Sequence, residues 1–380
     1  MKNMQEILDL FGNVVQVTWQ QVVMWIIGGI LVYLGICKKM EPSLLVPMGF
    51  GAILVNLPNS GAVTQGDVEG PIDTLFNAGI SNELFPLLLF IGIGAMIDFT
   101  PLLSNPKLIL FGGAAQFGIF FTFSLASLFG FELKDAASIA VIGAADGPTS
   151  IFVSQFFNSN YMGAIMVAAY SYMALVPIVQ PPIIKLITTK KERLIRMPYK
   201  GREVSKTAKI LFPILITVIA GIVAPSSVAL VGFLMFGNLI RECGVLNSLS
   251  ETAQNVLANL ITILLGITIS TRMQAEAFLQ WDTLLIMGLG LVAFIFDTVG
   301  GVLFAKLLNL IFPKNKVNPM IGASGISAFP MSARVVNKLG LQEDPQNFLL
   351  MHAVGVNVSG QIASVIAGGL IMTIVGSMIA

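Results

Sequence analysis

Long apolar runs separated by short polar connections fill most of the chain. Most of them approach the roughly 20 residues that an α-helix needs to cross the hydrocarbon core of a membrane. The runs fall near residues 20–37, 43–57, 83–99, 107–130, 136–155, 161–184, 208–224, 227–241, 254–270, 281–311, 318–338 and 347–378. This pattern predicts an all-α polytopic membrane protein with roughly ten to twelve membrane segments.

A basic loop divides the runs into two sets of six. Between Lys185 and Lys209 the chain carries nine Lys and Arg residues against two glutamates, and such clustering is typical of cytoplasmic loops. We therefore divide the chain into a first membrane repeat (1–184), a basic cytoplasmic loop (185–207) and a second membrane repeat (208–380).

The two sets share short sequence matches. Three of them recur in the same order at offsets of 174 to 183 residues, which points to an internal duplication. The matched segments are Pro42-Ser43 with Pro225-Ser226, Ile91-Gly92-Ile93 with Leu265-Gly266-Ile267, and Gly143-Ala144-Ala145 with Gly322-Ala323-Ser324.

The fifth run of each half contains helix breakers in its middle. Gly147-Pro148 interrupts the first, and Gly325 and Pro330 interrupt the second, so we predict two broken or re-entrant segments. If both re-enter, each half has about five true crossings, the basic loops share one side, and the second half is inverted relative to the first. The alternative is that these residues only permit close helix packing.

Composition agrees with a membrane location and excludes other classes. Of the 380 residues, 55% are hydrophobic and 11% are charged, whereas soluble domains carry about 25% charged residues. A net charge of +1 provides no basic field for nucleic acid. Two cysteines and one histidine cannot assemble a usual zinc site.

Asp146 carries the strongest functional signal, because it lies in a broken segment with no basic residue within ten positions. An ionised Asp at the centre of a bilayer costs roughly 2.5 to 3.5 kcal/mol. We expect it to bind a monovalent cation or exchange a proton, and the alternative is that it only caps the following half-helix. Tyr170 and Tyr172 in the next run have either an ion or proton role or a role in hydrogen-bonded packing.

Polar residues also surround the second break. They are Asn318, Ser324, Ser327, Ser332 and Arg334, with Asn357 and Ser359 in the last run. Arg334 is the cation expected to meet an anionic substrate, since a guanidinium binds a carboxylate through two hydrogen bonds; the alternative is a snorkelling arginine. Asp297 is predicted to be a second ion ligand or a partner of Arg334.

Three longer motifs carry the polar residues around the two breaks. They are Val141-Ile142-Gly143-Ala144-Ala145-Asp146-Gly147-Pro148-Thr149, the segment from Asn318 and Gly322 through Ser327-Ala328-Phe329-Pro330-Met331-Ser332-Ala333-Arg334, and Asn347-Phe348-Leu349-Leu350-Met351 leading to Asn357. Together they resemble the beta subunit of the biotin-dependent sodium-pumping decarboxylases, whose members act on oxaloacetate, glutaconyl-CoA or methylmalonyl-CoA. The resemblance covers nearly the whole chain.

The resemblance implies a function. A carboxyltransferase alpha subunit loads biotin on a gamma carrier subunit, and the beta subunit decarboxylates the carboxybiotin and pumps sodium outward while a proton is consumed. It implies an elevator-type core and scaffold in a beta homotrimer of the bacterial cytoplasmic (inner) membrane, with a small delta or gamma membrane subunit. Sodium is the only metal ion implied. The length of the chain favours an acyl-CoA member of the family.

The resemblance also implies roles for individual residues. Asp146 and Tyr172 would serve sodium binding and proton delivery. Asn318, Gly322, Ser327, Arg334 and Asn357 would form a second sodium site and the carboxybiotin pocket, with Asp297, Ser324 and Ser359 as secondary candidates. The competing hypothesis is a sodium-coupled secondary transporter of a small organic anion, which needs no partner subunit.

Overall fold

A computed structural model describes residue 12 and residues 16–39, 42–198 and 203–379. The part of the predicted basic loop that includes Lys200 and Arg202 lies outside the described residues. Helices are the only extended regular elements in the described part of the chain, where a single antiparallel bridge joins Gln65 and Val68.

Eight helical segments of the described chain are long and apolar enough to cross a membrane. They are Trp19–Lys38, Pro106–Leu128, Met162–Ile187, Lys206–Val223, Pro225–Cys243, Asn247–Met273, Trp281–Ile311 and Leu350–Ile379. The predicted all-α polytopic membrane fold is therefore confirmed. The apolar runs near 43–57 and 83–99 form the shorter helices α4 and α6. The inverted repeat, the five crossings of each half and the elevator movement stay predictions.

The chain contacts define two compact units, and each contains residues of both predicted repeats. Unit 1 holds residues 1–85 and 259–285, and unit 2 holds 86–258 and 286–380. This grouping follows spatial contacts, whereas the proposed repeats follow sequence matches, so the division of the chain at the basic loop stays a prediction. Three helices continue across the limits of the units: α6 (Leu84–Met96), α17 (Ala258–Ile269) and α19 (Trp281–Ile311).

Unit 1 is built around one helix pair. A capping box formed by Thr18 and Gln21 begins α3, and α3 packs along α4 where Gly28 and Gly49 meet with almost no space for side chains, as in other close helix pairs of membranes. Asn56 closes the unit by donating to the carbonyl of Met273 at 2.7 Å. The elements of unit 1 are α3 (Trp19–Lys38), α4 (Pro42–Val55), α5 (Pro71–Gly79), η5 (Ser270–Met273) and α18 (Ala275–Phe278).

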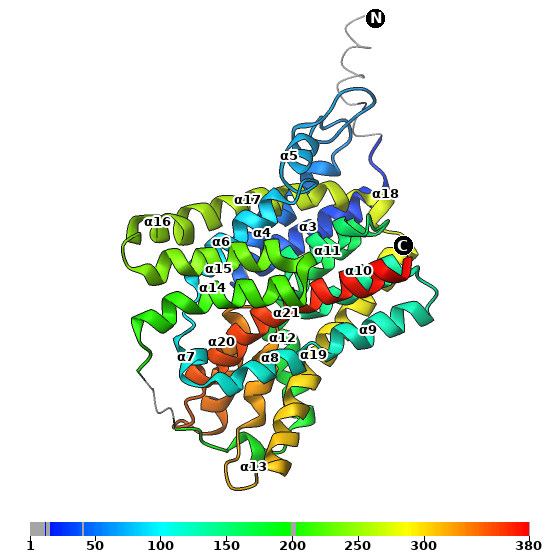
Figure 1. The fold of residues 1–380 in the computed structure, drawn as a ribbon. Coiled ribbons are helices and arrows are strands. Elements are labelled where there is room, and N and C mark those ends of the chain that lie inside the picture. The colour runs from blue at the N-terminus through cyan, green and yellow to red at the C-terminus, as the bar shows by residue number, and fades with distance from the viewer. Residues whose placement is uncertain (1–11, 13–15, 40–41, 199–202, 380) are drawn as a thin grey trace, which may run out of the picture. The chain divides into compact units, whose positions relative to one another are not determined.

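Unit 2 contains both interrupted segments and its core surrounds them. Helix α21 packs along α8, η6 and α20 (Figure 1), so the last helix of the chain runs past both breaks. The elements of this unit are α7 (Thr100–Ser104), η1 (Pro106–Leu108), α8 (Ile109–Ala115), α9 (Phe117–Leu128), α10 (Leu133–Ala140), η2 (Val141–Ala144), α11 (Gly147–Phe156), α12 (Met162–Ile187), α13 (Lys190–Arg193), α14 (Lys206–Val223), η3 (Pro225–Ser227), α15 (Val228–Cys243), α16 (Asn247–Glu251), the π-helix η4 (Thr252–Leu257), η6 (Pro319–Gly325), α20 (Met331–Glu343) and α21 (Leu350–Ile379).

Candidate functional site

The fifth runs of both halves are interrupted as predicted, and their breaks lie together. In the first, η2 ends at Ala144, Ala145 adopts a left-handed conformation with φ of 52°, and α11 begins at Gly147. In the second, the backbone is extended after Gly325. The amide of Ser327 donates to the carbonyl of Ala144 at 2.9 Å. The second break therefore supplies a donor and the first break an acceptor. Each replaces a hydrogen-bond partner that a continuous helix would provide within itself.

Asp146 lies at this junction with 3% of its surface exposed. One carboxylate oxygen accepts from the amide of Thr149 at 3.3 Å. The other accepts from the hydroxyls of Thr149 at 2.8 Å and Ser364 at 2.9 Å and from the amide group of Gln361 at 3.4 Å. The carboxylate is thus held by hydroxyl and amide donors from two helices.

All of these donors are neutral. Among the ion pairs of the described residues, none includes Asp146. The side chain caps α11, so the capping interpretation is confirmed, and the positive end of that helix favours a negative charge there. Capping leaves the charge itself without a counter-ion.

A short hydrogen-bonded path links the two breaks through α21. Ser327 donates to the hydroxyl of Ser364, which in turn donates to Asp146. Sequence reasoning missed Gln361 and Ser364. Their spacing after Asn357, at four and seven residues, places three polar side chains on one face of α21. That periodicity is a signal in the sequence from which both residues could have been found.

Unpaired oxygens gather around the second break. Asn357 donates to the carbonyls of Ser324 at 3.1 Å and Ile326 at 2.7 Å, and Gln116 donates to the carbonyl of Gly325 at 3.4 Å. Three oxygens are buried and have no hydrogen-bond partner within the described ranges: Asn357 Oδ1, Gln116 Oε1 and Ser324 Oγ. Neutral oxygens of this kind are suitable ligands for a hard cation. Sequence reasoning did not identify Gln116.

A second glutamine that sequence reasoning did not identify, Gln180, binds the same segment. Gln180 of α12 donates to the carbonyl of Ala323 at 2.8 Å and accepts from the hydroxyl of Ser332 at 2.9 Å. Because Gln180 is fully buried, its amide contributes polar partners that the unwound backbone would otherwise lack.

The two tyrosines of α12 have different environments. The hydroxyl of Tyr172 donates to the carbonyl of Met287 on α19. The ring of Tyr170 lies against Gly147 at the start of α11, and its buried hydroxyl has no partner. The structure therefore places Tyr170, rather than Tyr172, against the segment that Asp146 caps.

Asn318 lies apart from Asp146, at the start of η6. Its Oδ1 atom accepts from the amide of Met320 at 3.1 Å, and its Nδ2 atom donates to the carbonyls of Arg193 and Ile195, both at 2.9 Å. The side chain therefore joins the second broken segment to the basic loop. Its functional assignment stays a prediction.

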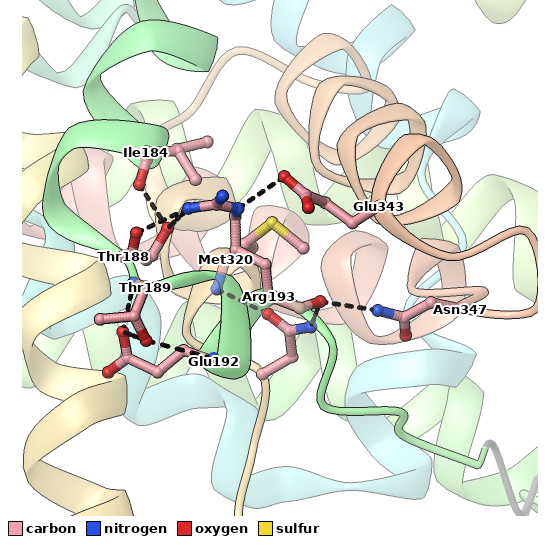
Figure 2. Close-up of polar contacts among 9 residues, drawn as sticks. Ile184, Thr188, Thr189, Glu192, Arg193, Met320, Glu343 and Asn347 are labelled. Atoms are coloured by element: carbon pink, nitrogen blue, oxygen red, sulfur yellow. Dashed lines mark hydrogen bonds and ion pairs between the residues drawn. The ribbon is translucent and has the colours of Figure 1, made fainter.

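The basic loop is anchored by Arg193 (Figure 2). Its guanidinium pairs with Glu343 at 2.7 Å, and its carbonyl accepts from Asn347 at 2.9 Å. Burial raises the pKa of Glu192, but hydrogen bonds from Thr189 and Lys306 outweigh it and hold this pKa below its ordinary value. The ionised Glu192 pairs with Lys306 of α19 at 3.2 Å, so the loop is held to α19 as well as to η6 and α20.

Arg334 is exposed and lies on the wall of a cavity of about 400 Å³. The cavity is lined by Arg334, Asn337, Lys338, Leu341, Gln342 and Leu350. Arg334 and Lys338 are one helical turn apart on α20, so both cations face one space. Asp297 is fully buried elsewhere and accepts from the amide of Ile119 at 3.2 Å, so its predicted pairing with Arg334 is not formed.

Two further candidates are packing residues in this structure. Gly322 of η6 contacts Gly301 of α19 so closely that a Cβ on either glycine would overlap the other's backbone. The hydroxyl of Ser359 donates to the carbonyl of Leu108 at 3.0 Å, which ties α21 to the start of α8.

Together, the apolar helices, the paired breaks and the carboxylate without a counter-ion define an ion-transporting membrane protein with discontinuous helices. A family described as the Na+-transporting oxaloacetate decarboxylase beta subunit matches residues 20–375. The chain belongs to this family, which confirms the resemblance found from the motifs. It is accordingly a multi-pass protein of the bacterial inner membrane and a subunit of a sodium-transporting decarboxylase.

Its relatives include members with three different substrates in their names. The chain is 49% identical to the glutaconyl-CoA decarboxylase subunit beta of Acidaminococcus fermentans, over 94% of each chain. It is 46% identical to the methylmalonyl-CoA decarboxylase subunit beta of Propionigenium modestum, over 98% of this chain and all of that one. It is 42% identical to the probable oxaloacetate decarboxylase beta chain of Vibrio cholerae, over 98% and 99%.

The contact between Gly301 and Gly322 generates a stability prediction. Replacing either glycine by alanine forces α19 away from the second broken segment, and we expect a loss of about 1–3 kcal/mol in the free energy of unfolding. Thermal unfolding in detergent measures it. Gly288→Ala, also in α19 but with open space around the site, is the matched control and should match or exceed the wild type. Wild-type stability of both Gly301→Ala and Gly322→Ala would show that the contact is not tight.

Proposed function

We propose that this chain decarboxylates carboxybiotin and couples that reaction to outward sodium pumping. Carboxybiotin is presented by a gamma carrier subunit after a carboxyltransferase alpha subunit has loaded it. We further propose a small delta or gamma membrane subunit and a beta homotrimer as the assembly. Membership of the decarboxylase family favours this function over the alternative of a sodium-coupled secondary transporter.

The observation that carries the proposal is the Asp146 carboxylate at the junction of two broken helices. Its donors are neutral, and a sodium ion there would supply the missing positive charge. An uncompensated carboxylate at membrane depth costs several kcal/mol, so its affinity for a cation is a direct consequence of its setting. Ser327 and Ser364 lie within the same hydrogen-bonded path and are the hydroxyl ligands that we assign to this sodium site.

A second sodium position is proposed at the second break. Asn357 Oδ1, Ser324 Oγ and Gln116 Oε1 are the buried oxygens that support it. They carry no formal charge, so a sodium ion bound there would be held less tightly than one beside Asp146. This site retains Asn357 and Ser324 from the sequence prediction and adds Gln116.

The carboxylate of carboxybiotin is assigned to the cavity beside Arg334. Arg334 offers two parallel hydrogen bonds to a carboxylate, and Lys338 adds a second positive charge on the same wall. Asn337 and Gln342 supply amide groups suited to the polar ureido ring of biotin. The reaction breaks the bond between the ring nitrogen and the carboxyl carbon, carbon dioxide leaves, and the nitrogen takes up a proton.

Loss of carbon dioxide couples to transport through charge. The anion that faced Arg334 disappears, and protonation of Asp146 then weakens its hold on sodium at the outer face. Tyr172 is the less suited proton donor, because its hydroxyl is engaged with the carbonyl of Met287. Moving one charge against 100 mV costs about 2.3 kcal/mol, so decarboxylation and ion movement must be tightly coupled.

An acyl-CoA, glutaconyl-CoA or methylmalonyl-CoA, is the proposed substrate of the whole complex. The acyl-CoA relatives are 46% to 49% identical to this chain, and the oxaloacetate relatives are 42% or 43% identical, over longer alignments. The alpha subunit selects the substrate, so the likeness of the beta subunits supports this choice indirectly.

The first prediction concerns Asp146. In the purified complex in proteoliposomes, we expect Asp146→Asn to lower sodium-dependent decarboxylation and ²²Na+ uptake by roughly 10- to 100-fold, because the charged ligand is lost. Asp135→Asn is the control, since that buried carboxylate is paired with Ser159 at 2.7 Å and lies outside the proposed site. Full sodium-dependent activity of Asp146→Asn would contradict the assignment.

The second concerns the cavity beside Arg334. Arg334→Ala should lower kcat/KM for the carboxylated carrier by roughly 10- to 100-fold, and Arg334→Lys should restore only part of it, because lysine keeps the charge without the paired hydrogen bonds. Sodium binding at equilibrium should stay unchanged in both variants. A carrier kcat/KM equal to the wild type would place carboxybiotin elsewhere.

The third concerns the substrate. The complex isolated through a tag on this chain should release carbon dioxide from glutaconyl-CoA or methylmalonyl-CoA in a sodium-stimulated reaction, and avidin should block it by binding the carrier biotin. Oxaloacetate is the comparison substrate. Faster turnover of oxaloacetate than of both acyl-CoA compounds would refute the acyl-CoA proposal while leaving the sodium pump intact.

A further inference from the structure

Asp297 occupies an unusual place in the middle of α19. It is fully buried, and it faces the span Pro106–Leu128 next to Gln116, where α8 ends and α9 begins. No ion pair of the described residues includes Asp297. A buried acid without a cationic partner, outside the site around Asp146, therefore remains to be explained.

One oxygen of Asp297 has a structural role. Oδ1 accepts from the amide of Ile119 at 3.2 Å, and the Gly118 amide also bonds to the carboxyl group. Both amides belong to the first turn of α9, where the carbonyl partners of a helix interior are missing; the Ile119 amide shares its proton with the carbonyl of Gln116 at 3.1 Å. A carboxylate at a helix N-terminus also gains from the helix dipole. Capping of α9 thus accounts for Oδ1.

The other oxygen has no such role. Oδ2 is buried without a hydrogen-bond partner among the described residues. It is the atom that faces Gly143, and a Cβ built on that glycine would lie 3.0 Å away from it. Gly143 belongs to η2, three residues before Asp146. The free oxygen therefore points at the back of the first broken segment, on a different part of it from the Asp146 site.

An independent oxygen lies on the same helix face. Gly118 of α9 meets α19 at Ala293 and Asp297, and Thr122 follows it by four residues, so it lies one turn along the same face. Thr122 is fully buried, and its hydroxyl has no hydrogen-bond partner in the part of the chain that the structure describes. In most helices such a hydroxyl bonds to the carbonyl four residues earlier, which makes its unpaired state informative.

We propose that Asp297 Oδ2 and the Thr122 hydroxyl form a further monovalent-cation site behind the first broken segment. The free carboxylate oxygen provides charge and the hydroxyl provides a neutral ligand, a donor set suited to sodium. A cation there would rest against Gly143 and so bias the position of η2, the segment that carries Asp146. The inference rests on the proposed sodium transport for its physiological ion, but its test requires no decarboxylation.

The experiment measures sodium bound at equilibrium, by ²²Na+ dialysis of the purified complex in detergent. Asp297→Asn keeps an oxygen that can cap α9 and replaces the free oxygen by an amide NH₂. We expect this variant to bind one sodium ion fewer per chain than the wild type, while its thermal unfolding stays close to the wild type. Thr122→Val removes only the hydroxyl and should weaken the same class of sites by roughly three- to tenfold.

Asp146→Asn and Asp135→Asn complete the design. The first should lose a different sodium ion, so that the double variant with Asp297→Asn loses two, and the second should bind as the wild type does. Wild-type sodium binding in both Asp297→Asn and Thr122→Val overturns the proposal and reduces Asp297 to a helix cap. If Asp297→Asn does not fold, Thr122→Val decides alone, and unchanged affinity overturns the site. If instead the proposed sodium pump is wrong, Asp146→Asn will bind as much sodium as the wild type.

Discussion

The hydrogen bond from the Ser327 amide to the Ala144 carbonyl joins two segments that have each given up helical hydrogen bonds. In an apolar core no water is available to hydrogen-bond these backbone groups. Unwinding one segment alone would therefore leave unpaired donors and acceptors. Two breaks placed side by side satisfy part of each other's backbone. The remaining partners come from α21 and α12, whose Asn357 and Gln180 amides hold the unwound chain.

That shared junction explains why charge is tolerated where it is. Asp146 is held by the start of α11, by the Thr149 hydroxyl and by side chains from α21, all of them neutral. This environment offers neutral hydrogen-bond donors, and no ion pair of the described residues places a fixed cation beside the carboxyl group. A mobile cation or a proton is then the natural partner, which is the requirement for a transport site rather than for a structural ion pair.

The sites that we propose for the anionic substrate and for the cation occupy separate places in unit 2. Arg334 faces an open cavity with Lys338, and Asn318 belongs to the network around Arg193, whereas Asp146 is buried at the junction. The second broken segment connects them, since it begins at Asn318, meets the first break at Ser327 and leads into α20 with Arg334. A change at the cavity can therefore reach the proposed ion site along a single stretch of chain, without a contact between the two places.

Local rules were enough to determine part of this architecture from the sequence. Apolar runs indicated the spanning helices, and Gly and Pro inside two of them indicated the breaks, because both residues act on their own backbone. The buried carboxylate at Asp146 was recognisable for the same reason, as was its capping role. The family followed from contiguous motifs. Only the tertiary structure decided which distant side chains meet.

The structure brought Ser364, Gln361 and Gln116 to the breaks from other helices. It showed that the Asn318 side chain binds the backbone of the basic loop. It also showed that Asp297 bonds to the backbone of α9 and does not pair with Arg334. These outcomes depend on how helices far apart in the chain pack against one another, and neither a propensity nor a motif within one helix encodes that packing.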